Sequence, residues 1–192
     1  MMDQQRIENA VRELLDAVGE DTTRPGLIET PERVARMYQE VFGSLDKPAD
    51  FKDYKVFETT EDPGLVMVQQ IPFYSMCEHH LLPFFGHVTI GYMPSHKRII
   101  GLSKLGRLVD FVARRPSVQE VLTTSIADQL QRVLDPKGIA VSVTARHMCM
   151  EMRGINRGDL FTYTSRYTGV FKTDLALRQE FQQEAQHRNG NR

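Results

Sequence analysis

Apolar residues near the start of the chain recur every three or four positions, which is the spacing of one face of an α-helix. The first run covers residues 7–18 and ends at GEDTTRPG, a sequence of helix breakers. A second run covers residues 30–42, where Thr30 is the expected cap and Pro31 suits the first helical position. We therefore predict two helices, which form an N-terminal helical arm over residues 1–45.

A polar connector over residues 46–63 separates this arm from the rest of the chain. After it, residues 65–74 (LVMVQQIPFY) and 87–94 (HVTIGYMP) are rich in β-branched and aromatic side chains, which is typical of strands. Apolar and polar residues alternate through residues 139–152 (IAVSVTARHMCMEM). Residues 159–171 (DLFTYTSRYTGVF) have a similar composition. Each of these segments predicts a strand.

Two further helices are predicted between the two pairs of strands. Residues 103–116 (SKLGRLVDFVARRP) carry an apolar stripe, and Ser103 is a candidate cap. Residues 117–138 carry a longer stripe. This second helix opens with SVQE, which matches a capping box in which Ser117 caps the helix and Glu120 folds back to it.

The order of these elements is helix, helix, strand, strand, helix, helix, strand, strand, which is typical of an α+β domain. We expect an antiparallel sheet with helices on one face, in a domain over residues 64–182. Residues 183–192 are polar and are expected to form a frayed tail. The last two strands are long for a domain of this size, and their open edges would invite pairing with another subunit.

The composition narrows the class of protein. The chain has 192 residues, of which 41% are hydrophobic and 26% charged, as in a soluble globular domain. A formal net charge of −1 provides no overall basic field to attract nucleic acid or a membrane. No apolar run is long enough to cross a bilayer, and the first residues lack the regions of a signal peptide. We therefore expect a cytoplasmic protein, in which reducing conditions argue against a disulfide between Cys77 and Cys149.

The segment YSMCEHHLLPFFGH concentrates candidate metal ligands, because it holds one of the two cysteines and three of the six histidines. Cys77 and His80 are three residues apart, a common spacing of zinc ligands in a turn. Cys149 lies in the alternating segment, where side chains two positions apart share a face. His147 would then lie beside Cys149, about 6.6 Å along the strand, and would be at the site whether or not it binds the metal.

Three interpretations of this constellation are open. In the first, the cysteines and histidines are core residues and no metal binds. In the second, a closed structural zinc has four protein ligands, Cys77, His80, Cys149 and His147. In the third, an open catalytic zinc has three protein ligands and a water, and His79 and His147 serve as acid/base groups. The third is favoured, because a closed site leaves His79 without a role.

Basic residues recur on two predicted helices and after the metal segment. They are Arg33, Arg36, Lys104, Arg107, Arg114 and Arg153. Each residue alone is best explained as part of a solvated surface. Several of them close to a metal would instead suit the binding of a polyphosphate group. Ser103, at a helix start, would add backbone amides that favour anions. Glu120 also has a second interpretation, in which its carboxylate accepts two hydrogen bonds from a base edge such as that of guanine.

Several blocks of the sequence, in order, resemble one family. TPERVARMY, CEHHLLPFFGHVTIGY, GLSKLGRLVDFVARRPSVQE and HMCMEMRG are together similar to the zinc-dependent type of GTP cyclohydrolase I, from about Thr30 to Phe181. The resemblance implies a tunnelling fold, in which sheets pair between subunits into a ring and two rings stack as a homodecamer. It also implies conversion of GTP and water to 7,8-dihydroneopterin triphosphate and formate, the first step of pterin and folate biosynthesis.

The resemblance further implies a role for individual residues. Zinc would be bound by Cys77, His80 and Cys149; protons would be transferred by His79 and His147; guanine would be recognised by Glu120 and Gln119; ribose and triphosphate would be held by Ser103, Lys104, Arg107 and Arg153; and a neighbouring subunit would contribute Arg33 and Arg36. Arg36 stands where the family often has lysine, so that a planar fork replaces a point charge.

Two other functions stay open at this level. One is a non-catalytic nucleotide-binding module with a structural zinc. The other is a related tunnelling-fold enzyme that acts on a different pterin or deazapurine and uses a cysteine as nucleophile.

Overall fold

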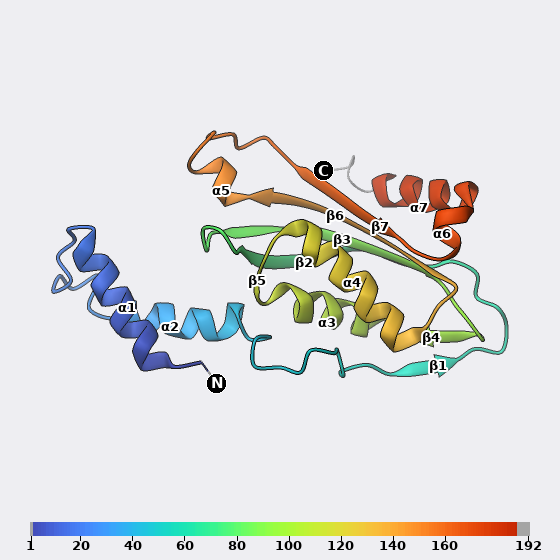
Figure 1. Ribbon diagram of the computed structural model, residues 1–192, viewed down its shortest axis with the longest axis horizontal. Helices are drawn as coiled ribbons and strands as arrows, with labels where there is room; N and C mark the ends of the chain where they lie inside the picture. The colour runs from blue at the N-terminus through green and yellow to red at the C-terminus, as the bar shows by residue number, and fades with distance from the viewer. Residues whose placement is uncertain (1, 188–192) are drawn as a thin grey trace. The chain divides into compact units, whose positions relative to one another are not determined.

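The computed structural model describes residues 2–187, which divide into two compact units, one that ends at Lys47 and one that begins at Pro48 (Figure 1). The first unit contains α1 (Gln4–Ala17) and α2 (Thr30–Val41), so both helices predicted in this region are confirmed. The cap predicted for α2 is wrong. The cap position belongs to Glu29, and no side chain there bonds to the helix, while the Thr30 hydroxyl donates to the carbonyl oxygen of Gly26.

The second unit is built on a five-stranded sheet. As far as residue 187, the unit has seven strands in all, of which two form a separate small sheet. They are β1 (Val56–Glu58), β2 (Val66–Cys77), β3 (Pro83–Met93), β4 (Arg98–Ile100), β5 (Pro116–Ser117), β6 (Gly138–His147) and β7 (Thr162–Tyr167). The main sheet has the order β5-β2-β3-β6-β7, and β1 pairs with β4 in a separate two-stranded sheet. The expected antiparallel sheet is therefore mixed, because the short β5 runs parallel to β2.

The larger core lies between the sheet and two helices, α3 (Leu102–Ala113) and α4 (Gln119–Leu134). Each helix contributes one apolar stripe, and alternate residues of β3 and β6 face it. The fully buried side chains of this core include Leu105, Leu108, Leu122, Ile126, Leu130, Val88, Ile90, Val141 and Val143. Both helices are confirmed, and Figure 1 shows them along the same face of the sheet.

Two further helices cover part of the other face of the sheet, which corrects the expectation of helices on one face. They are α6 (Val170–Thr173) and α7 (Leu175–His187), and they form a second, smaller core around Ala140, Phe171 and Phe181. The sequence around α7 is polar because only its inner side is buried. The tail predicted over residues 183–192 is therefore wrong as far as residue 187, and its remainder lies outside the described residues.

Neither side-chain cap predicted in this unit forms. The cap position of α3 is Gly101, and Ser103 lies within the first turn. Ser117 belongs to β5, and its hydroxyl donates to the carbonyl oxygen of Val118, which is the residue at the cap position of α4. Glu120 is consequently not held in a capping box, and its carboxylate is exposed in the first turn of the helix.

Strand register brings the ends of β2, β3 and β6 together. Phe84 near the start of β3 pairs with His147 at the end of β6, and Cys77 ends β2 just before the turn into β3. Close contact between β3 and β6 requires a glycine, since a Cβ on Gly86 would lie 2.0 Å from the carbonyl oxygen of Thr144. This end of the sheet carries the candidate site.

Within residues 2–187, no helix combines the length and the apolar composition that a membrane span requires.

Candidate metal centre and active site

The turn after β2 brings Cys77 and His80 together. Backbone hydrogen bonds close it, from Leu81 N to the Cys77 carbonyl oxygen and from Cys77 N to the Leu82 carbonyl oxygen, each at 2.8 Å. Leu81 has a left-handed backbone with φ of 52°, which reverses the chain toward β3. As a result, Cys77 Sγ and His80 Nδ1 are 3.8 Å apart.

Cys149 completes the cluster from a distant part of the sequence. Its Sγ and the candidate ligand atoms of Cys77 and His80 all lie within 4.8 Å of one another. The predicted strand over residues 139–152 is too long, because β6 ends at His147 and α5 (Met148–Glu151) follows as a single helical turn. Cys149 therefore reaches the site from a helix. Its predicted position beside His147 on one strand face is wrong.

The donor set suits a zinc ion. Two sulfurs and one imidazole nitrogen are the ligands that zinc prefers, and three protein ligands leave a coordination position open. Both cysteines are free thiols. Burial raises the pKa of the Cys149 thiol, and the neighbouring Cys77 adds to this effect. A cation between the two sulfurs would favour their thiolate forms instead.

His147 lies outside the ligand cluster. Its ring stacks on Phe84, with centroids 5.0 Å apart and planes 3° apart, and its Nε2 is 2.8 Å from Gln119 Oε1. Burial lowers the pKa of His147, while the charges of Glu120 and Glu151 oppose this shift. His147 is not among the candidate ligands that lie within 4.8 Å of one another, and its Nε2 is engaged by the glutamine, an arrangement that favours the open site over the closed one.

His79 stands at the solvent side of the cluster. Its ring is exposed, with Nδ1 4.0 Å from Cys77 Sγ and Nε2 3.8 Å from a carboxylate oxygen of Glu78. His79 is thus beside the candidate ligands without belonging to their group. Two histidines, one exposed and one half-buried, therefore flank the cluster.

Arg153 also lies at this site. Its Nη1 is 3.0 Å from His80 Nε2, the ring nitrogen that faces away from Cys77. Arg153 reaches the site from the segment that follows α5, just before the chain turns at Gly154, whose φ is 65°. An exposed guanidinium next to the cluster is suited to an anionic substrate group.

Gln119 and Glu120 begin α4 with different surroundings. Gln119 is buried, and its carboxamide bonds to His147, to Thr164 and to backbone carbonyl groups. Glu120 is exposed, yet its charge acts on His147. Of the two residues assigned to guanine, only Glu120 has a side chain that is exposed to solvent.

The predicted phosphate-binding residues of α3 lie elsewhere in the second unit. Lys104 Nζ and Arg107 Nη1 each donate to a different carboxylate oxygen of Asp53, both at 2.6 Å. The hydrogen bonds from Lys104 and then from Arg107 hold the pKa of Asp53 below its ordinary value. Ser103 is exposed in the first turn of α3. Asp53 was not predicted, because it belongs to the polar connector and no motif marks it.

The start of α3 and the metal cluster are at opposite ends of the sheet. Ile100 N, two residues before α3, donates to the hydroxyl of Tyr92 at 3.3 Å. Tyr92 and Phe84 are eight residues apart on β3, or about 26 Å at the usual rise of a strand. Figure 1 likewise shows β4 and α5 at opposite ends of the sheet. One chain therefore does not bring Lys104 and Arg107 to its own metal cluster.

Arg33 and Arg36 belong to α2 in the first unit. Arg33 Nη2 is 2.5 Å from a carboxylate oxygen of Glu29, and Arg36 pairs with Glu32. All four side chains are exposed, as on a solvated helix face.

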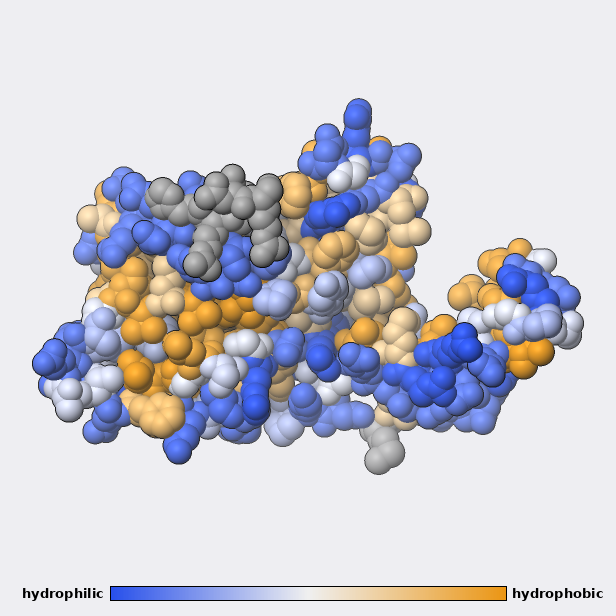
Figure 2. All heavy atoms as spheres, turned by 180° about the vertical axis from the view of Figure 1, so that it is seen from behind, coloured by the Kyte–Doolittle hydropathy of each residue, from blue (hydrophilic) through white to orange (hydrophobic). Residues whose placement is uncertain are grey.

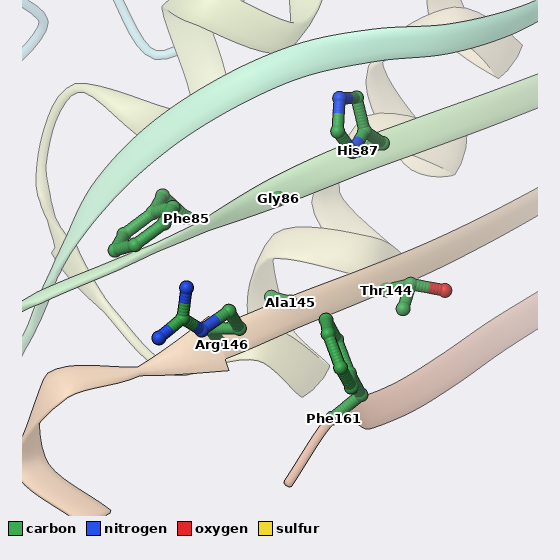
Figure 3. Close-up of a pocket in the computed structure, with 7 residues that line it drawn as sticks. All are labelled: Phe85, Gly86, His87, Thr144, Ala145, Arg146 and Phe161. Carbon is green, nitrogen blue, oxygen red and sulfur yellow. The ribbon is translucent and has the colours of Figure 1, made fainter. Parts of the chain in front are cut away.

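A separate pocket of about 330 Å³ opens on the other face of the same strands. Figure 3 shows it between Phe85, Arg146 and Phe161, with His87 and Thr144 further along β3 and β6. Because side chains alternate along a strand, His147 and Phe84 point to the opposite face. The pocket is therefore distinct from the metal cluster, and His87 belongs to the pocket.

Comparison with known proteins identifies the family of the chain. A model of the family described as GTP cyclohydrolase I matches residues 7–186. The protein named GTP cyclohydrolase 1 from Lactiplantibacillus plantarum is 59% identical over 180 residues, which cover 94% of this chain and 95% of the relative. The protein of the same name from Latilactobacillus sakei is 57% identical over 181 residues, which cover 93% of this chain and 95% of the relative.

A third relative has a lower sequence identity to this chain. GTP cyclohydrolase 1 from Thermoanaerobacter pseudethanolicus is 50% identical over 181 residues, which cover 94% of this chain and 95% of the relative. Similarity of this extent includes every element from α1 to α7 that the site depends on. The chain therefore belongs to the GTP cyclohydrolase I family.

Proposed function

We propose that this protein is a zinc-dependent GTP cyclohydrolase. It opens the imidazole ring of GTP by hydrolysis at C8, releases formate, rearranges the ribose by an Amadori step and closes the ring of 7,8-dihydroneopterin triphosphate. The observation that carries this proposal is the Cys77–His80–Cys149 cluster with His147 beside it but engaged elsewhere. A three-ligand cluster flanked by histidines supports chemistry better than a structural role.

Zinc held by Cys77, His80 and Cys149 would supply a Lewis acid that activates water near neutral pH. The protein's own groups then provide the proton transfers that ring opening, formate release and the Amadori step require. His147 is half-buried and His79 is exposed, so their environments differ although both flank the cluster. Two titratable groups in different environments suit a reaction that needs both an acid and a base.

Glu120 is proposed to recognise guanine. Its carboxylate is exposed at the first turn of α4 and is close enough for its charge to act on His147. A carboxylate can accept two parallel hydrogen bonds from the ring N–H and the amino group of guanine. This arrangement would place the purine beside the histidine and the metal.

Triphosphate binding is proposed to involve more than one subunit. Arg153 lies at the metal cluster, whereas Ser103, Lys104 and Arg107 lie at the far end of the same sheet. A second chain whose α3 start meets the cluster of the first would complete the site. Arg33 and Arg36 are proposed to reach the triphosphate from a neighbouring chain in the same way.

The surface of the second unit supports such an assembly, which we propose to be a homodecamer of two stacked rings. Within the described residues, β7 is an outer strand of the sheet with one edge unpaired. Large apolar side chains are exposed on β7 and just before it, including Tyr163 and Phe161. Figure 2 shows apolar residues gathered on one face of the molecule between hydrophilic borders. Open edges and apolar patches of this kind mark subunit contacts.

The proposal is tested by comparing histidine variants. We expect His79→Ala and His147→Ala to keep zinc and fold but to lose at least about 100-fold in pterin formation from GTP, the usual contribution of acid/base groups. The control is His87→Ala, which changes a histidine of the same segment that faces the separate pocket. The readout is pterin fluorescence after oxidation, with zinc measured in parallel. Loss of zinc from His147→Ala would instead indicate a closed structural site.

A further inference from the structure

Gln119 is a buried residue whose carboxamide is fully engaged. Its exposed fraction is 1%, and its Nε2 is within 3.0–3.1 Å of three acceptors. These acceptors are the carbonyl oxygens of Val143 and Thr162 and the hydroxyl of Thr164. They come from β6, from the start of β7 and from its interior, so the amide links two strands to the first turn of α4.

These contacts fix which way the carboxamide faces. Carbonyl oxygens only accept hydrogen bonds, so the NH₂ group must face Val143 and Thr162. The oxygen Oε1 must then face His147 Nε2, which it meets at 2.8 Å. An amide oxygen cannot donate, so Nε2 must carry the proton of this bond. In the neutral ring, the lone pair is consequently on Nδ1.

A second contact restrains the plane of the same ring. His147 lies parallel to Phe84, at 3°, with centroids 5.0 Å apart. The glutamine bond limits rotation of the ring about its side-chain axis, and the phenylalanine limits its tilt. Phe84 is itself fully buried, and its backbone pairs with that of His147. The ring is therefore held on two sides by groups that are themselves buried.

We infer that Gln119 is the positioning residue for His147: its buried carboxamide orients the ring and makes Nε2 the donor, which leaves Nδ1 to exchange protons with the substrate. The inference rests on the proposed role of His147 in proton transfer. It also replaces the assignment of Gln119 to guanine. Every donor and the oxygen of this amide already have partners within the protein, and the side chain is closed to solvent.

The kinetic test separates positioning from guanine recognition. Gln119→Met keeps the size of the side chain and removes the oxygen that faces His147. We expect kcat to fall about 10- to 100-fold, as when the outer partner of a functional histidine is lost, with KM for GTP changed less than about threefold. A rise in KM with kcat unchanged would overturn the inference and return Gln119 to the substrate.

The matched control is Gln129→Met on the same helix. Gln129 is also a buried glutamine, and its carboxamide bonds to Phe51 N and to the carbonyl oxygen of Ala49, away from His147. Any general effect of losing a buried amide from α4 should appear in both variants. Equal loss of kcat in the two variants would contradict a specific effect on His147.

A double variant tests whether the two residues act together. If Gln119 acts through His147, Gln119→Met should cost nothing further in a His147→Ala background, so the double variant should match His147→Ala. If the double variant instead loses the product of the two single-variant losses in kcat, the glutamine acts independently and the inference is overturned.

A direct measurement does not depend on turnover. Protein labelled with ¹⁵N in its histidine rings, assigned with His147→Ala, should show a neutral His147 with its proton on Nε2. A proton on Nδ1 would overturn the inference even if GTP is turned over. Conversely, a proton on Nε2 in protein that forms no pterin would leave the contact intact while contradicting the proposed function.

Discussion

Cys149 and His147 are two residues apart, yet they belong to different elements and have different partners. The spacing of Cys77 and His80 was sufficient to predict their pairing, because a turn brings residues three apart together. Cys149 was also predicted to be at the site, although from a strand that in fact ends before it. Strand alternation cannot reveal where a strand gives way to a helical turn, and for this reason the predicted neighbourhood of His147 and Cys149 was wrong.

Asp53 shows what residue types alone could not predict. The cations Lys104 and Arg107 were predicted to bind phosphate, but their partner in the chain lies some fifty positions earlier. A carboxylate held by both cations occupies donors that a phosphate group would need. In the proposed enzyme, substrate binding would therefore displace Asp53.

We predict that Asp53→Asn lowers KM for GTP about two- to fivefold, the size expected when an exposed ion pair no longer competes. The measurement is KM from initial rates of pterin formation at fixed ionic strength. The control is Asp50→Asn, because Asp50 pairs instead with Arg132 at 3.0 Å on the same unit. A higher KM in Asp53→Asn would show that this carboxylate orients the two cations rather than competing with the substrate.

At the scale of elements, the periodic segments were predictable and the polar ones were not. The predicted helices became α1, α2, α3 and α4, and the four predicted strand segments overlap β2, β3, β6 and β7. By contrast, α7 was not predicted, because only a few of its residues are apolar and its composition is that of a polar tail. The two-residue β5, which makes the sheet mixed, is too short to leave any pattern.

The burial of α7 leads to a stability prediction. Phe181 is fully buried and packs edge-on against Tyr167 and Phe171. Phe181→Ala should lower the free energy of unfolding by about 3–5 kcal/mol, the usual cost of emptying such a site. Leu175→Ala is the matched control, because Leu175 lies on the same helix and is 64% exposed. Equal stability of the two variants in denaturant unfolding would mean that α7 does not pack on the sheet.

At the scale of the whole molecule, the chain alone cannot complete the proposed site. The metal cluster and the cations of α3 lie at opposite ends of one sheet, so the two groups can meet only between chains. No periodicity or motif in a single sequence predicts the distance between the cluster and these cations, because that distance depends on the length and direction of β3. The ring was expected from the resemblance alone, and the distance along the sheet now gives a physical reason for an assembly.

If each active site is formed by two chains, mixing two inactive variants with different defects should restore activity. Cys149→Ala removes a proposed metal ligand and Lys104→Ala removes a proposed phosphate-binding cation, so each homo-oligomer should form pterin poorly. Mixed oligomers, refolded or co-expressed, contain some sites with both groups intact and should recover up to about a quarter of wild-type activity. Light scattering establishes that the mixed particle has the native mass. A mixture no more active than its parts would show that each site is complete within one chain.

The most direct test of the account relates zinc content to GTP turnover. Metal-free protein is titrated with zinc, and bound metal, pterin and formate are measured on the same samples. We predict that pterin formation rises in proportion to bound zinc, ends at one zinc per chain, and yields one formate for each pterin. Folded protein that is fully loaded with zinc and forms no pterin from GTP, or that turns over GTP equally well without metal, would contradict the account.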